Sequence, residues 1–253
     1  MGNGPGQIVD VRLPRSIDGG KIGAPVKAVL FDPPHSSAGR KGLGRPAPGR
    51  RRLTVLGVDL GGVENRPSGI ALLRGWKAST LLLFGDEEIL EFARQADPLL
   101  VAIDAPLHRP PGRLSMADRN GAHYRSCDLE LRRLGIPFFP ITLGPMRGLT
   151  ERGIRLKERL AAAGLAAVEI YPGGAQDVWG LPRARRDLAR LRRGLARLGV
   201  RGLTPGASEH ELDAVTGALV GRLYLQGRAR ILGDLSTGAI LMPPGLPKRR
   251  SVR

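Results

Sequence analysis

Residues 53–62 read LTVLGVDLGG, and this stretch decides the fold. A mostly apolar run that ends in Asp59 is typical of a buried strand that presents a charged side chain at its carboxyl end. The two glycines that follow permit a tight turn and a close approach of the backbone to a ligand. A carboxylate beside so apolar a run is costly unless it pairs with a cation or accepts hydrogen bonds. Asp59 is therefore a candidate functional residue, with a strand-end turn aspartate as the alternative.

Residues 99–107, LLVAIDAPL, repeat this pattern. A continuous apolar run predicts a central strand, Asp104 lies at its carboxyl end, and Pro106 leads the chain out of the sheet. Ligands of α/β proteins collect at the carboxyl ends of strands. If the two strands are parallel neighbours, Asp59 and Asp104 share one acidic cleft. A purely structural aspartate is the alternative for Asp104 as well.

Two further acids lie on later elements. Residues 166–171 (AAVEIY) predict a strand on which Glu169 faces either the cleft or solvent. Ser208 and a glutamate three residues later fit a capping box that begins a helix over residues 208–226. Asp213 lies in the first turn of this helix, beside an apolar stripe that docks the helix on the sheet. It is therefore expected at the edge of the cleft, although an acid there also suits the helix dipole.

The order of the elements predicts the fold class. Hairpins come first and crossovers follow, which indicates an α/β fold with a mixed sheet flanked by helices. We expect strands at residues 53–60, 69–73, 79–84, 99–104, 166–171 and 237–242, and helices at residues 86–95, 118–134, 150–163, 183–198 and 208–226.

One folded domain is expected over residues 53–244. Residues 1–52 are predicted to be a disordered tail that is basic and rich in glycine and proline, and residues 245–253 a short basic tail. We expect the long tail to be a solvated linker, a segment that results from a misassigned start codon, or a contact for nucleic acid.

The composition bounds the partners. The net charge of +17 is suited to a polyanion such as nucleic acid. Only six of the 40 Lys and Arg residues are lysines, however, so the codon bias of a G+C-rich genome explains the charge equally well. The single cysteine, Cys127, excludes an internal disulfide and a Cys-x-x-Cys zinc motif. No apolar run is long enough for a membrane span or a secretory signal, so a cytoplasmic protein is expected.

Carboxylates gathered in one cleft repel each other unless a hard cation neutralises them. Magnesium prefers oxygen ligands and keeps several of its waters. Such ions can stabilise both the attacking and the leaving oxygen in the displacement at a phosphodiester. The acids therefore favour a magnesium- or manganese-dependent hydrolase that acts on nucleic acid.

Several motifs, in this order, resemble the RuvC-like branch of the ribonuclease H superfamily. They are more specifically similar to the predicted nucleases of domain-of-unknown-function family 429. The resemblance covers most of residues 53–244 and none of the first fifty residues. The matching motifs lie at residues 57–62, 101–107, 127–132, 146–153, 168–172 and 210–219.

The resemblance implies a ribonuclease H-like fold and a set of site residues. Asp59, Asp104 and Asp213 would be metal ligands and catalytic, with Glu169 as a fourth catalytic acid. The residues that it implies for substrate binding are Arg132, Arg147, Thr150 and Arg152.

Arginine can hold phosphate bidentately, which suits this role. The resemblance also draws attention to Asp128, for which an ion pair with Arg132 along one helix is the alternative. Cys127 is expected to be a small packed residue rather than a nucleophile.

Two other functions stay open. A non-catalytic nucleic-acid-binding domain of the same fold would use the basic stretch at residues 183–197 as its phosphate-binding face. An actin-like ATP-binding phosphotransferase would need a second glycine-rich loop, for which the chain offers only Gly173 and Gly174. The sequence leaves open whether the substrate is RNA or DNA, whether cleavage is internal or terminal, and the oligomeric state.

Overall fold

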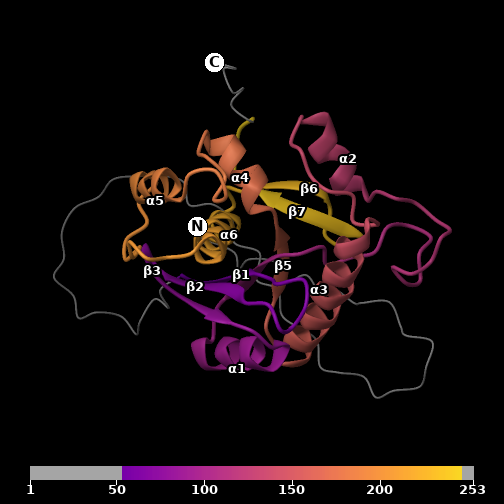
Figure 1. Ribbon diagram of the computed structural model, residues 1–253, viewed down its shortest axis with the longest axis horizontal. Helices are drawn as coiled ribbons and strands as arrows, with labels where there is room; N and C mark the ends of the chain where they lie inside the picture. The colour runs from indigo at the N-terminus through magenta and orange to yellow at the C-terminus, as the bar shows by residue number, and fades with distance from the viewer. Residues whose placement is uncertain (1–52, 247–253) are drawn as a thin grey trace, which may run out of the picture. The chain divides into compact units, whose positions relative to one another are not determined.

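The computed structural model describes residues 53–246, so the tail predicted at residues 1–52 and residues 247–253 of the second tail lie outside the described part. Seven strands of the described residues form one sheet in the order β3-β2-β1-β4-β5-β7-β6 (Figure 1). The strands are β1 (Thr54–Asp59), β2 (Ser68–Arg74), β3 (Lys77–Leu83), β4 (Leu100–Asp104), β5 (Ala167–Ile170), β6 (Arg230–Asp234) and β7 (Gly238–Met242).

The sheet is mixed, as predicted. Strands β1, β2 and β3 form an antiparallel meander, whereas β4, β5 and β7 run parallel to β1, and β6 is antiparallel to β7. In the parallel pair of β1 and β4, Asp59 lies directly opposite Asp104. The condition for a shared acidic cleft is therefore met.

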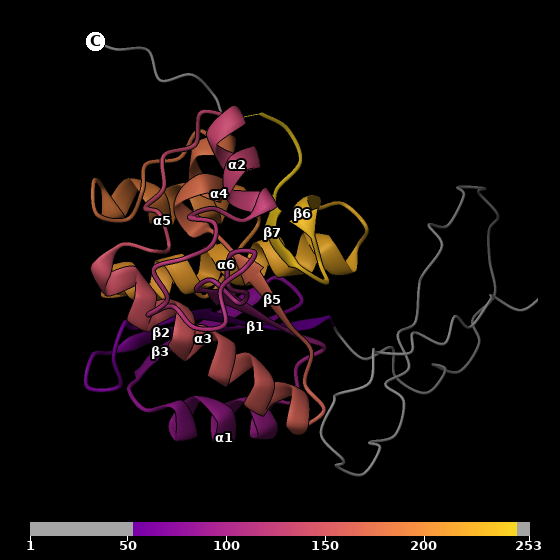
Figure 2. The same ribbon diagram turned by 90° about the vertical axis from the view of Figure 1, so that its right-hand side faces the viewer.

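Helices cover both faces of this sheet, as Figures 1 and 2 show from two directions. The described helices are α1 (Asp86–Ala96), α2 (Ser126–Arg133), α3 (Gly144–Ala162), α4 (Pro172–Trp179), α5 (Leu188–Arg197) and α6 (Glu209–Leu225). Side chains alternate along β1, so that Leu56 and Val58 pack with α1 and α3, while Val55 packs with α4, α5 and α6. No helix within residues 53–246 is long and apolar enough to span a membrane.

Helix α6 lies unusually close to the sheet because two strand residues have no side chain. A Cβ at Gly57 would lie 2.0 Å from the carbonyl oxygen of Ala214, and one at Gly69 would lie 2.0 Å from that of His210. Only glycine permits this approach. Ser208 caps the helix through the predicted capping box. These contacts fix the first turn of α6 beside the carboxyl end of β1.

The predicted helix over residues 118–134 is wrong in its first half, because only Ser126–Arg133 is helical. The carboxylate of Asp118 instead accepts hydrogen bonds from the backbone N–H groups of Leu114 and Ser115, which closes a turn. Gly121 has a positive φ of 87°, which a right-handed helix does not contain.

The starts of two other helices differ from the prediction, and two elements were not predicted. Helix α3 begins at Gly144, six residues before the predicted start, because a proline suits its first turn. Helix α5 begins only at Leu188, where the side chain of Asp187 caps it by accepting the backbone N–H of Arg190. The sequence analysis missed α4 and β6. Two glycines follow Pro172 and lower the apparent helix propensity of α4, and β6 carries charged residues at both ends.

Candidate functional site

Asp59 and Asp104 form an acidic pair at the carboxyl ends of β1 and β4. The two residues lie directly opposite each other in the parallel pair, and their side chains interact electrostatically. Burial raises the pKa of Asp104 well above its usual value, and the negative charges of Asp59 and Asp213 raise it further. Two carboxyl groups so close together repel each other, so a proton or a cation between them is favourable.

Asp213 comes from α6 and belongs to the same electrostatic group. The prediction that it lies in the first turn is wrong, because it is the fifth residue of the helix and a turn has about 3.6 residues. Burial and the charge of Asp59 raise the pKa of Asp213 to about 7. Gln176 on α4 donates a hydrogen bond of 2.6 Å from its Nε2 to an oxygen of Asp213. The Oε1 atom of Gln176 is buried and has no hydrogen-bond partner among the described residues. It is therefore the amide nitrogen of Gln176, and not its oxygen, that faces Asp213.

His210 orients Asp59 rather than Asp213. Its Nδ1 atom lies 2.6 Å from an oxygen of Asp59. That hydrogen bond is the main reason why the pKa of His210 lies above its usual value, and the charge of Asp59 adds to it. The pairing of His210 with Asp59 joins α6 to β1, so it depends on how α6 docks on the sheet and not on any local sequence pattern.

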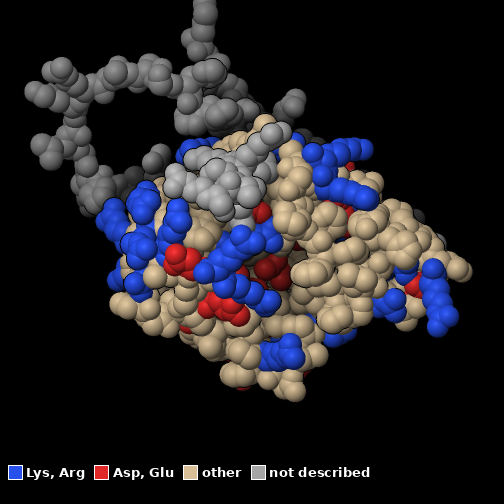
Figure 3. All heavy atoms as spheres, turned by 45° about the horizontal axis from the view of Figure 1, so that its top comes forward, with Lys and Arg blue, Asp and Glu red and all other residues tan. Residues whose placement is uncertain are grey.

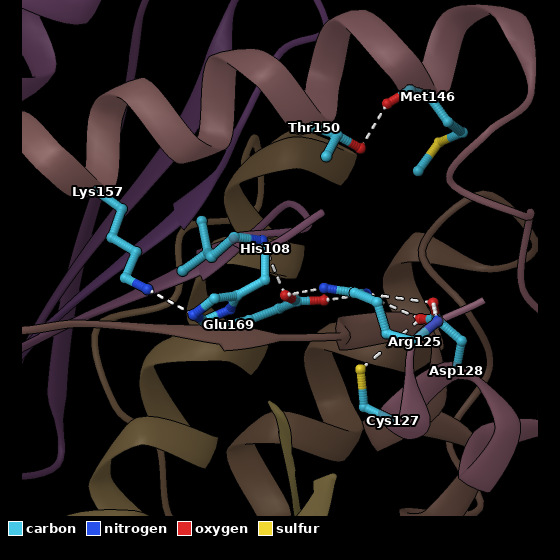
Figure 4. A network of polar contacts seen from close by, with 9 residues as sticks. His108, Arg125, Cys127, Asp128, Met146, Thr150, Lys157 and Glu169 are labelled. Carbon is cyan, nitrogen blue, oxygen red and sulfur yellow. Dashed lines mark hydrogen bonds and ion pairs between the residues drawn. The ribbon is translucent and has the colours of Figure 1, made fainter. Parts of the chain in front are cut away.

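Glu169 is held by a buried arginine, as Figure 4 shows. Arg125 donates to both oxygens of Glu169, at 2.6 and 2.8 Å, and the backbone N–H of Leu107 adds a third hydrogen bond. Burial still raises the pKa of Glu169, and Arg125 opposes that shift. The carboxylate is thus neutralised by the protein itself. Its predicted catalytic role stays a prediction.

Arg125 also binds Asp128, and the sequence analysis missed this arginine. Its guanidinium group donates to both oxygens of Asp128, so the ion pair weighed between Asp128 and Arg132 is not formed. Both partners of the Arg125–Asp128 pair are buried. Cys127 is also buried, and burial raises its pKa to about 12, in agreement with the packed role expected for it.

The four arginine and threonine residues predicted to bind substrate divide into two pairs. Arg152 is buried and donates to Asp86 and to the carbonyl oxygens of Gly61 and Phe84, so it ties the turn after β1 to the start of α1. Thr150 is buried and donates to a carbonyl oxygen one turn back in α3. Neither offers a group to a ligand in this arrangement. Their predicted contact with substrate stays a prediction.

The second pair lies at the surface. Arg147 is exposed and donates to the carbonyl oxygen of Thr142. Arg132 is exposed, with its guanidinium carbon 5.8 Å from the centre of the Tyr124 ring. Both side chains remain accessible to a ligand.

The acids line a cavity of about 910 Å³. Figure 3 shows acidic atoms in the depth of a hollow, with basic side chains beside it. The acids and the histidine that line it are Asp59, Asp104, Asp128, Glu169, Glu209, His210 and Asp213. The arginines among the lining residues include Arg66, Arg183, Arg185 and Arg186. An acidic floor with basic walls suits a ligand that carries phosphate groups and brings a cation.

The described residues contain no group of three or more His, Cys, Asp or Glu side chains close enough together to hold a metal ion. A magnesium ion does not need three such side chains, because it is commonly held by one or two carboxylates, with waters and substrate phosphates as its other ligands. The pair of Asp59 and Asp104 supplies two such carboxylates, and Asp213 lines the same cavity. The donor set therefore fits a hard divalent cation.

Comparison with known proteins adds little. No family model matches the chain, and no curated protein does. One solved structure that matches is RuvC of Thermus thermophilus, with 15% sequence identity and a TM-score of 0.40 over 76% of this chain and 100% of that chain. So distant a likeness carries no argument about the site. The strand order and strand directions themselves confirm the predicted class, an α/β fold with a mixed sheet flanked by helices, whereas its ribonuclease H-like type stays an expectation.

Proposed function

We propose that this chain is a metal-dependent nuclease in which Asp59 and Asp104 hold a magnesium or manganese ion. One observation carries the proposal: two carboxyl groups lie opposite each other on adjacent parallel strands, in a cavity whose walls carry arginines. Such a pair is unfavourable unless a proton or a cation lies between the two groups. A cation has the additional effect of attracting the phosphate groups that the arginines also favour.

A bound magnesium ion would supply charge neutralisation and Lewis-acid activation for displacement at phosphorus. The protein's own residues would do the rest. His210 fixes the orientation of Asp59, and Gln176 fixes that of Asp213, which we propose as the third acid of the site. The exposed Arg185 and Arg186 would bind phosphates of the substrate. Membership of domain-of-unknown-function family 429 is part of the same proposal and rests on the motifs alone.

A non-catalytic nucleic-acid-binding domain is the second candidate. It is favoured by the exposed arginines of the basic stretch at residues 183–197, which are Arg185, Arg186, Arg190, Arg193 and Arg197. The phosphotransferase alternative gains no such support, because Gly173 and Gly174 lie in the first turn of α4 and not in an extended loop.

The test is cleavage of single-stranded, duplex and branched RNA and DNA, with magnesium and with a chelator. We expect metal-dependent cleavage that Asp59→Asn and Asp104→Asn each reduce by at least about 100-fold, as expected when a group essential to the chemistry is lost. Glu158→Gln is the matched control, since Glu158 is an exposed acid outside the cavity. Cleavage that survives both aspartate variants refutes the proposal. Salt-sensitive binding without any cleavage would favour the binding domain.

A further inference from the structure

One wall of the acidic cavity carries an aromatic side chain that has no role in the proposed metal site. Phe139 is 74% exposed and lines the same cavity as Asp59 and Asp104. Burying so large an apolar side chain would stabilise the fold by about 2 kcal/mol, so its exposure next to polar groups is unfavourable for the protein alone. An exposed aromatic residue in a cavity points to a ligand with an apolar face.

The backbone holds Phe139 in this place. The hydroxyl group of Tyr171 donates to the carbonyl oxygen of Pro137 at 2.7 Å, and a guanidinium nitrogen of Arg183 donates to the same oxygen at 3.1 Å. The N–H of Leu143 donates to the carbonyl oxygen of Pro140, which closes a turn on the other side. The exposed ring is therefore presented by a loop that is anchored on both sides.

A second, smaller cavity of about 390 Å³ adjoins the first. Phe138 lines both cavities, and Tyr124 and Arg132 line the second one. The rings of Tyr124 and Phe138 meet edge to face with their centres 6.1 Å apart. Arg132 lies over the Tyr124 ring, and its guanidinium group is exposed. The smaller cavity thus combines aromatic rings with an accessible cation, the groups that recognise a base and a phosphate.

We propose that residues 136–143 form a stacking platform, so that the substrate of the acidic site is a single-stranded polynucleotide. One unpaired base stacks on Phe139 in the larger cavity. A neighbouring nucleotide enters the smaller one, with its phosphate on Arg132. The bases of a duplex stack on each other and do not offer their faces to such a platform. This inference rests on the proposed function for its choice of a polynucleotide.

Binding without metal tests the platform, because cleavage is then absent. We would measure the dissociation constants of single-stranded and duplex oligonucleotides of one sequence, as RNA and as DNA, in the presence of a chelator. One position would carry the fluorescent base 2-aminopurine, whose emission falls on stacking. Phe139→Ala should weaken single-strand binding about tenfold and abolish the quenching, because stacking contributes about 1–3 kcal/mol per base. Duplex binding should change less than about twofold by the same reasoning.

Two control variants make the result specific. Phe139→Tyr should keep both the affinity and the quenching, because it keeps the ring. Leu114→Ala removes a side chain that is 90% exposed and lines neither cavity, and should change nothing. The platform is refuted if Phe139→Ala leaves single-strand binding unchanged, if it weakens duplex and single strand equally, or if the wild-type chain binds no single strand.

The outcome is separate from that of the proposed function. Single strands that bind through Phe139 but are never cut would support the platform and overturn the nuclease. Duplex cleavage that needs Asp59 but not Phe139 would support the nuclease and overturn the platform.

Discussion

Gly57→Ala tests how the site is assembled. A Cβ at this position would lie 2.0 Å from the carbonyl oxygen of Ala214, whereas such atoms essentially never approach within 3.0 Å of each other. Helix α6 would therefore have to move about 1 Å away from β1, and overpacking of this kind costs about 1–3 kcal/mol. The same helix carries His210 and Asp213. A displacement of about 1 Å at reacting groups can lower a rate about 100-fold, so activity should fall with stability.

The assay is denaturant unfolding, with cleavage measured in parallel. Gly62→Ala is the matched control in the same motif, because a Cβ there would meet nothing within 4 Å. We expect a lower unfolding midpoint for Gly57→Ala and an unchanged one for Gly62→Ala. Equal midpoints for Gly57→Ala and the wild-type chain would show that α6 does not depend on this close approach.

Three further predictions concern buried groups. Burial and the charge of Lys157 lower the pKa of His108 to about 4. The folded chain therefore binds fewer protons than the unfolded one between pH 6.5 and 4, so the free energy of unfolding decreases as the pH falls through this window. His108→Gln should lose less of this free energy over the same window. Identical pH profiles of the variant and the wild-type chain would contradict this. Arg125→Met should lower the free energy of unfolding by about 3–5 kcal/mol, because it leaves buried carboxylates without a cation. Adding Glu169→Gln should restore part of this free energy. An Arg125→Met variant as stable as the wild-type chain would contradict this. Cys127, buried and with a pKa of about 12, should react with a thiol reagent at pH 8 only after unfolding, and rapid labelling of the native chain would count against its packing.

Local patterns predicted the parts of the site that depend on one element. Asp59 and Asp104 each end an apolar strand, and this position is visible in a few neighbouring residues. The capping box at Ser208 likewise predicted the start of α6, although Asp213 lies in the second turn of this helix and not in the first. Whether these acids share a site depends on the parallel pairing of β1 with β4, which the order of the elements made plausible but only the structure shows.

Contacts between distant residues explain what the sequence did not predict. Arg125 meets Glu169, which lies 44 residues later, and Arg152 meets Asp86, which lies 66 residues earlier. No spacing rule connects such partners, so a buried arginine that binds the protein looks the same in sequence as one that binds phosphate. The false helix before residue 126 has a local cause, the turn that Asp118 closes, which competes with helix formation.

The most direct test of the account is calorimetric titration of the chain with manganese. The acidic pair should bind the ion in the wild-type protein and equally in the surface control Glu158→Gln. Asp104→Asn should weaken binding at least about tenfold, a loss of about 1.4 kcal/mol, because one of two carboxylate ligands is removed. An unchanged dissociation constant in Asp104→Asn would show that the pair of Asp59 and Asp104 is not the metal site, and the account would be wrong at its centre.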